Sequence, residues 1–281
     1  MEKLVLWRKE IEEDFAGASE KQLDDFLDLI RYIRQNDIRS GICKSTLDKS
    51  ELWEWLYSKD QIELNDIKRE LSRYIEKTTF MDEEEFDKFF GQIGRLYAVK
   101  VLALSFKKEN IYHISTIAEY YAGIRDYLVT EKKDEFCNDL QDCFPSIYFA
   151  KGIGTTVNTL NQRFEEIQRE IVDHLVQIND YHAKFLELLE KHKSYQEIAR
   201  EFSMDTGIEC SPQAGRAKIQ ALKELCLNEI SGQDEIVVCE LHTKFKTFNI
   251  DRERQDRIYF FPGKKGILGG KIIVKHIGTH L

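Results

Sequence analysis

The segment 236–281 constrains the fold most, because apolar and polar residues alternate at its start with a period of two. The apolar positions are Val237, Cys239, Leu241 and Phe245, and the polar positions are Glu240, His242, Lys244 and Lys246. Such alternation is typical of an antiparallel strand with one buried and one polar face.

Two further strands are expected before the chain ends. In 256–261, Ile258 and Phe260 alternate with Arg257 and Tyr259, and Pro262-Gly263 then interrupts the pattern. A third strand is expected over 271–281, after a glycine-rich turn. The spacing of His276 and His280 places both on one side of that strand, together with Val274 and Ile272. The three strands should therefore bring Lys, His, Arg and Tyr side chains close together.

The last strand carries a recognisable run of residues, Ile272-Ile-Val-Lys-His-Ile-Gly-Thr-His280. This run resembles the closing strand of the HigB branch of the RelE-like toxins. The order of a Glu-Leu-His strand, an Arg-Ile-Tyr-Phe strand and a Lys-Ile-Ile-Val strand is similar to the last three strands of that superfamily. The resemblance covers about a sixth of the chain. It implies a compact domain that cleaves mRNA without a metal, with Lys and His transferring protons and Arg holding the phosphate.

A RelE-like fold begins with a strand and two helices, which 147–149 and a helix from Val157 would supply. The stretch 180–230 is longer than the family pattern, which is consistent either with an elaborated member or with a different fold that shares a three-stranded tail.

RNA cleavage without a metal needs a base for the 2′-hydroxyl, a cation at the phosphate and an acid for the leaving oxygen. Arg257 suits the phosphate, because its guanidinium is planar and permanently charged. His276 or His280 is the candidate acid, and Lys244 or Lys246 the candidate base. The candidate substrate-binding residues are His242, Tyr259 and Lys275.

Two other interpretations use the same residues. Glu240, His242, His276 and His280 are residue types that bind Zn²⁺ or Mn²⁺, but the neighbouring lysines and arginines disfavour a cation, so no metal and no cofactor is expected. The other interpretation is that these residues form an ordinary polar sheet face without catalytic function.

The charge of the chain is distributed unevenly. The net charge is −9, yet residues 241–281 hold nine Lys/Arg and three Asp/Glu, which leaves −15 for the first 240 residues. A basic terminal sheet on an acidic body favours contact with phosphate. Lysines that protect sheet edges from other chains would account for some of these charges.

The remaining composition indicates a cytoplasmic protein without a membrane span. No run approaches the ~18 apolar residues that a span requires, and no signal peptide is recognisable. The six cysteines show no CxxC or Cys/His ligand spacing, so they are expected to be reduced.

The first half of the chain mainly shows helical periodicity. Ser19-Glu-Lys-Gln22 has the form of a capping box before a helix, and further helices are expected at 53–57, 63–77, from Glu83 and from Ser115. The apolar run 96–106 is consistent with a buried strand to which 110–114 would pair. His113 is expected to be structural rather than a general base.

In the second half, Thr155 or Thr156 is expected to cap a long helix that runs from Val157 to Ile178. Ser194-Tyr-Gln-Glu197 is a second capping box, and Ser211-Pro212 should start a helix over 214–230.

The sequence thus predicts a predominantly helical α+β protein. Residues 1–143 would form a mostly helical module, and 144–281 an α+β module with a small antiparallel RelE-like sheet. The expected function is a metal-independent endoribonuclease, as in a toxin or phage-defence effector, restrained by the first module. Its expected partners are RNA or ribosome-bound mRNA and an antitoxin or other defence protein. The alternative is a non-catalytic protein that binds a partner protein or a nucleic-acid backbone through the basic sheet.

Overall fold

The computed structural model describes residues 2–59, 61–95, 99–213, 216–246 and 254–281. The chain divides into two compact units, Met1–Glu131 and Lys132–Leu281. The boundary expected at residue 143 lies at the end of helix α8 (Lys133–Cys143), whereas the chain divides before that helix. Within the described residues, no helix combines the length and the apolar character needed to cross a bilayer.

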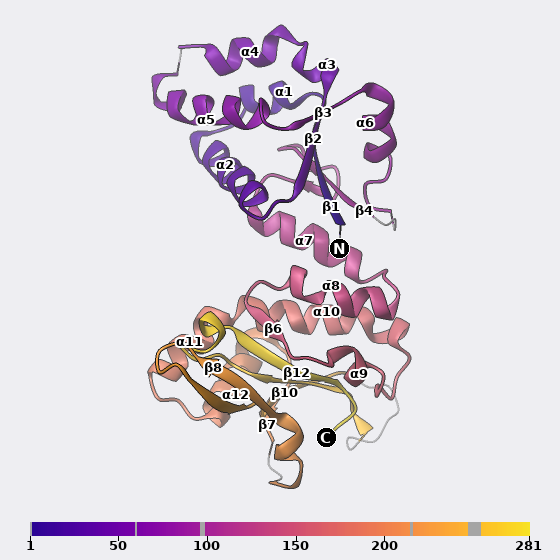
Figure 1. Cartoon of the computed structure of the whole chain (residues 1–281), viewed down its shortest axis with the longest axis vertical. Helices are drawn as coiled ribbons and strands as arrows, with labels where there is room; N and C mark the ends of the chain where they lie inside the picture. The colour runs from indigo at the N-terminus through magenta and orange to yellow at the C-terminus, as the bar shows by residue number, and fades with distance from the viewer. Residues whose placement is uncertain (1, 60, 96–98, 214–215, 247–253) are drawn as a thin grey trace. The chain divides into compact units, whose positions relative to one another are not determined.

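The first unit is built on a parallel sheet with strand order β3-β2-β1-β4-β5 (Figure 1). The strands are β1 (Glu2–Trp7), β2 (Arg39–Cys43), β3 (Thr79–Met81), β4 (Val99–Leu104) and β5 (His113–Ile114). The helices are α1 (Ile11–Ala16), α2 (Glu20–Gln35), α3 (Lys44–Leu47), α4 (Ser50–Tyr57), α5 (Asn65–Ile75), α6 (Glu83–Phe90) and α7 (Ile117–Leu128). This strand order reverses beside β1, as in doubly wound α/β folds.

Helices cover both faces of this sheet. Leu4 and Leu6 of β1 belong to the core cluster that contains Phe86 of α6. On the other face, the rings of Trp7 and Phe26 of α2 meet edge to face with centroids 5.7 Å apart. Because β1 is buried on both faces, its sequence has no alternation that would reveal a strand.

The prediction of a mostly helical first module is therefore correct only in part. The pairing of β4 with β5 is confirmed, although residues 96–98 of the predicted run lie outside the described residues. The capping box at Ser19 is also confirmed. The sequence interpretation missed β1, β2 and β3, and with them the parallel sheet.

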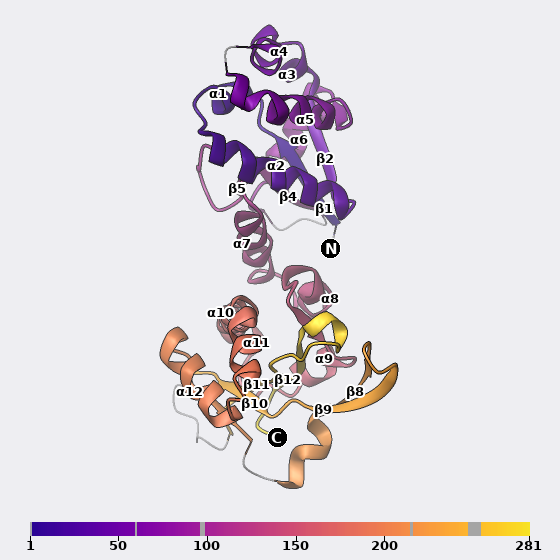
Figure 2. The same cartoon turned by 90° about the vertical axis from the view of Figure 1, so that its left-hand side faces the viewer.

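The second unit contains a five-stranded sheet with strand order β6-β12-β11-β10-β7 and a separate hairpin of β8 and β9 (Figures 1 and 2). The strands are β6 (Ile147–Phe149), β7 (Cys210–Pro212), β8 (Lys223–Asn228), β9 (Gln233–Val238), β10 (Leu241–Lys244), β11 (Arg257–Phe261) and β12 (Ile272–Gly278). The other helices are α9 (Ile153–Val157), α10 (Phe164–Asp180), α11 (His182–Glu190) and α12 (Tyr195–Thr206).

The expected antiparallel sheet is seen in part. Strands β10, β11 and β12 pair in antiparallel fashion, as the alternating pattern indicated, and β7, which was not predicted, adds antiparallel to β10. Strand β6 joins the sheet in parallel beside β12, with Ile147 opposite Ile272. The sheet of the second unit is thus mixed: β6 is parallel to β12, and the other neighbouring strands are antiparallel.

Three local predictions in this unit are wrong. Residues 223–228 form β8 rather than a helix, although lysine, glutamate and leucine favour helix there. Ser211 and Pro212 belong to edge strand β7. Thr155 and Thr156 lie inside the short helix α9, and the long helix α10 starts only at Phe164. The predicted helix start at 214–215 lies outside the described residues.

The two faces of the second sheet differ in what covers them. On one face, Phe260 packs against Phe185 of α11 and Phe202 of α12, with ring centroids 5.6 and 6.4 Å apart. On the other face, a cluster joins the sheet to the β8–β9 hairpin, and it consists of Cys226, Val237, Cys239, Phe261, Ile267 and Ile273. Tyr259 alternates with Phe260 and therefore lies on this second face, together with His242 and His276 opposite it.

Candidate functional site

Strand register places five of the candidate residues on one face of the sheet. His242 of β10 lies opposite Tyr259 of β11, and Tyr259 lies opposite His276 of β12. Lys244 lies opposite Arg257 in the same way. Side chains directly opposite each other project from the same face of a sheet, so these residues share one face.

A β-bulge corrects the expected arrangement of the last strand. The register shifts between Tyr259 and Phe260, so that Phe260 faces Val274 while Tyr259 faces His276. Because Tyr259 and Phe260 are neighbours on a strand, Val274 and His276 lie on opposite faces. The sequence analysis placed both on one side, since simple alternation cannot show an extra residue.

The centre of the site is a contact between Arg257 and His242. The Nη1 of Arg257 lies 3.0 Å from Nε2 of His242. Because a guanidinium can only donate, Nε2 is the acceptor, and the ring proton lies on Nδ1. The Oγ of Ser211 lies 3.1 Å from the same Nε2. His242 Nδ1 and Arg257 Nε are buried without a hydrogen-bond partner.

Tyr259 connects this pair to the end of the chain. Its hydroxyl accepts a hydrogen bond from the backbone N–H of Leu281 at 3.2 Å, and Arg257 Nη1 lies 3.5 Å away. The side chain of Gln213 contacts the same hydroxyl at 3.4 Å. Half-buried Gln213 and Leu281 therefore border the site, while Tyr259 itself is completely buried.

Burial governs the protonation of the two histidines. Desolvation and then the charge of Arg257 lower the pKa of His242 to about 3. Desolvation also lowers the pKa of His276 and raises that of Tyr259. All three groups are thus neutral at pH 7, and the guanidinium of Arg257 carries the charge among these four side chains.

The remaining histidines have distinct positions. His276 Nε2 donates to the carbonyl of Thr279 at 2.9 Å, which holds the turn after β12. His280 is half-buried, and its charge contributes to the lowered pKa of His242. His280 is therefore the histidine of this group that lies nearest the surface.

The three lysines predicted for the site have other contacts. Lys244 forms an ion pair with Glu209, and Lys275 forms one with Glu224. Lys246 is exposed, and its backbone N–H donates to Glu170 at 2.6 Å. The structure thus brings together Arg257, His242, Tyr259 and His276, but it engages Lys244 and Lys275 with carboxylates.

Sequence reasoning missed Asp256, which fixes the start of β11. Its fully buried carboxylate accepts hydrogen bonds from the backbone N–H groups of Asn161 and Gln162 at 3.0 and 3.1 Å. The Nδ2 of Asn161 also donates to Thr279 Oγ1 at 2.9 Å. One loop therefore holds both the strand that carries Arg257 and the turn that carries His280. An acidic residue directly before Arg257 was the available signal.

Gly278 explains the glycine of the Ile-Gly-Thr-His run. A Cβ on Gly278 would lie 2.2 Å from Thr159 Oγ1 and 2.5 Å from the carbonyl oxygen of Thr156. Thr156 Oγ1 also accepts a hydrogen bond from the N–H of Ile277 at 3.1 Å. Helix α9 therefore approaches β12 so closely that only glycine fits.

Among the described residues, no group of three or more His, Cys, Asp or Glu side chains is placed to hold a metal ion. The four residues considered for Zn²⁺ or Mn²⁺ are thus not assembled into one set. Comparisons with protein-family models, with curated proteins and with solved structures find no match to this chain.

Proposed function

We propose that the second unit binds a phosphodiester at Arg257 and cleaves RNA without a metal ion, as a RelE/HigB-like domain would. One observation carries this proposal. Arg257 is 8% exposed, and no carboxylate of the described residues forms an ion pair with it. Its contacts are with the neutral His242 and Tyr259.

An unpaired buried cation is costly, which is why such a group suits an anion site. Moving a charge out of water costs several kcal/mol unless an opposite charge compensates it. A bound phosphate would supply that opposite charge and accept from the unpartnered Nε in a forked hydrogen bond. Gln213, His280 and Leu281 border the cluster as half-buried residues, so the phosphate would approach from their side.

The cleavage step needs proton transfer next to this phosphate. His280 is the proposed acid for the leaving 5′-oxygen, because it lies nearest the surface and close enough to His242 for their charges to interact. Lys244, opposite Arg257, is the proposed base once it leaves Glu209 and loses its own proton, because only the neutral amine accepts a proton. Each such group contributes ~10²–10⁴-fold, so the pair would support modest turnover.

The burial of His242 and His276 favours a second candidate, which is binding of a nucleic-acid backbone without cleavage. Their exposed fractions are 3% and 5%, and His276 donates its proton to a backbone carbonyl. In this alternative, Arg257 binds phosphate and no bond is broken. The first unit would restrain or recruit the second in either case.

The test uses the purified full chain, a fluorescent single-stranded RNA and EDTA. We expect the wild-type chain to cleave the RNA in the presence of EDTA. Arg257→Lys should weaken RNA binding at least tenfold, because lysine lacks the planar guanidinium that binds phosphate through two hydrogen bonds. The matched control is Arg254→Lys, which alters an exposed arginine three residues earlier.

Substitution of His280 separates the two candidates. His280→Ala should abolish product while RNA affinity changes less than about threefold, because a proton donor acts on turnover. Binding that depends on Arg257, without product from the wild-type chain, would support the second candidate. An unchanged affinity of Arg257→Lys would refute both.

A further inference from the structure

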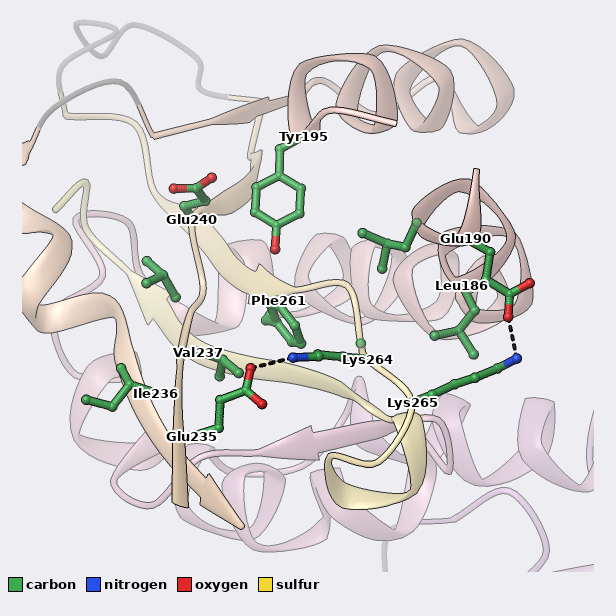
Figure 3. A pocket seen from close by; sticks show the side chains of 13 residues that line it. Leu186, Glu190, Tyr195, Glu235, Ile236, Val237, Glu240, Phe261, Lys264 and Lys265 are labelled. Carbon is green, nitrogen blue, oxygen red and sulfur yellow. Dashed lines mark hydrogen bonds and ion pairs between the residues drawn. The ribbon is translucent and has the colours of Figure 1, made fainter. Parts of the chain in front are cut away.

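A cleft that shares no residue with the Arg257 cluster lies beside the β8–β9 hairpin (Figure 3). Its volume is about 540 Å³, within the range of ligand sites. Leu186 of α11 and Tyr195 of α12 form one side, and Phe261 lies between them and β9. Strand β9 contributes four consecutive residues, 235–238, to the lining. No residue of β8 lines the cleft, so it follows the edge of β9 that faces away from β8.

The hydrogen-bonding pattern of the hairpin leaves backbone groups free along that edge. The N–H of Cys239 donates to the carbonyl of Leu222 at 2.9 Å, so these residues form a hydrogen-bonded pair. Hydrogen-bonded and non-hydrogen-bonded pairs alternate in an antiparallel ladder. The pairs Leu225–Ile236 and Lys223–Val238 are therefore of the second kind. The N–H and C=O groups of Ile236 and Val238 point outward, which is the template that a further strand requires.

The cleft offers an apolar surface and one carboxylate for such a strand. Phe261 and Val237 are 7% and 4% exposed, and the ring of Tyr195 projects over them (Figure 3). The other two glutamates of the lining are neutralised, since Glu235 pairs with Lys264 and Glu190 with Lys265.

Glu240 has no ion-pair or hydrogen-bond partner for its side chain among the described residues, and it is half-buried. A half-buried carboxylate beside apolar side chains complements a basic group carried on an apolar stem.

The hairpin also exposes apolar side chains next to this edge. Ile236 is 57% exposed and points to the other side of the strand from Val237 (Figure 3), and its cross-strand neighbour Leu225 is 62% exposed. Leu227 and Ile230 are 55% and 79% exposed. A cluster of this kind on one short hairpin is typical of an interaction surface.

We propose that β9 docks an extended segment of a partner protein, which adds as a strand along Ile236 and Val238 and places a lysine or arginine against Glu240. The backbone edge supplies affinity, and the cleft selects an apolar residue that neighbours a basic one. This site is separate from RNA binding, so its test does not depend on the proposed nuclease.

The experiment selects octamer peptides from a random displayed library on the immobilised full chain and measures their affinity by fluorescence polarisation. We expect enriched peptides to alternate apolar residues and to carry Arg or Lys. Ile236→Pro removes an outward N–H without breaking the β8–β9 ladder, so it should weaken binding about tenfold, the equivalent of ~1.4 kcal/mol.

The matched control is Leu225→Pro, which removes the equivalent N–H and an equally exposed side chain from the opposite edge. It should bind within about twofold of the wild-type chain. Glu240→Gln should weaken Arg-containing peptides about fivefold and leave their Arg→Gln versions unchanged. Hydrogen exchange on the unaltered chain gives a second readout, in which the amides of Ile236 and Val238 gain protection when peptide is bound.

Three results would overturn the proposal. Peptides that bind Ile236→Pro as well as wild type, or the absence of enriched peptides, would exclude strand addition at β9. Concentration-dependent dimerisation that Ile236→Pro abolishes and Leu225→Pro preserves would assign the edge to a second copy of this chain instead.

Discussion

Replacing Arg257 with methionine should stabilise the second unit while it removes the affinity for anions. Methionine is unbranched and carries no charge, and replacing buried ion pairs by apolar residues is often neutral or stabilises proteins by ~1–4 kcal/mol. The loss is the hydrogen bond to His242 Nε2, worth ~0.5–1.5 kcal/mol, and the longer contact of 3.5 Å with the Tyr259 hydroxyl. Ser211 Oγ, 3.1 Å from that nitrogen, remains as a donor. We therefore expect a net gain in the free energy of unfolding of up to about 3 kcal/mol.

Calorimetry of the full chain measures this gain, because a chain with two units unfolds in more than one step. For a domain of this size, ~1 kcal/mol corresponds to about 3 °C in Tm, so the Tm of the second unit should rise by up to roughly 9 °C. Sulfate at ten times its Kd should stabilise the wild-type unit by ~1.4 kcal/mol and leave Arg257→Met unchanged.

Two controls separate a specific effect from a general one. Arg254→Met alters an exposed arginine, and sodium chloride at equal ionic strength accounts for screening. A lower Tm in Arg257→Met, or equal stabilisation of both proteins by sulfate, would refute the idea that the buried Arg257, which has no carboxylate partner among the described residues, binds an anion.

Three further predictions concern stability. The pKa values of His242 and His174 lie at about 3 and about 4, below the usual 6.5, so the folded state binds fewer protons than the unfolded state. Stability should be full above pH 6.5 and fall as the pH drops towards 4, and His242→Gln should remove ~1.4 kcal/mol per pH unit of this slope in urea titrations. Asp256→Ala removes the buried carboxylate that accepts from the N–H groups of Asn161 and Gln162, so it should cost ~2–4 kcal/mol and speed hydrogen exchange at both amides. The exposed Asp234→Ala should change neither quantity. In the first unit, Asp14→Ala should lower the free energy of unfolding by ~2–4 kcal/mol in urea titrations. The reason is that Asp14 accepts hydrogen bonds from Ser105 Oγ, Phe106 N–H and Arg8 at 2.9–3.1 Å. The control Glu13→Ala, at an exposed position, should lower it by less than ~0.5 kcal/mol.

Patterns within a single element were readable from the sequence. The capping boxes at Ser19 and Ser194 form as expected, since both depend only on residues three positions apart. Strand β11 was also found, because Ile258 and Phe260 alternate with Arg257 and Tyr259. What failed required distant contacts. Strand β8 contains helix-forming residues and becomes a strand only by pairing with β9, which tertiary context decides.

The same distinction applies to the candidate site. The sequence alone predicted that Arg257, His242 and Tyr259 lie close together. That prediction needed only the period-two alternation of each strand and antiparallel pairing between neighbouring strands. The register shift at Tyr259/Phe260 and the burial of His276 were not predictable, since both depend on contacts between segments that are far apart in the sequence.

Fewer positive charges of the terminal segment are available to bind phosphate than its number of lysines and arginines suggested. Lys244, Lys264, Lys265 and Lys275 each pair with a glutamate of the same unit. Phosphate contact should therefore depend on Arg257 and one or two neighbours rather than on a broad basic patch. Because the logarithm of affinity for single strands falls by ~0.7 per phosphate contact for each tenfold rise in salt, RNA binding should show a slope of about −1.4 to −2.1. A slope near −4, as six contacts would give, would mean that RNA displaces the glutamates and that the whole sheet, not the Arg257 cluster, is the binding surface.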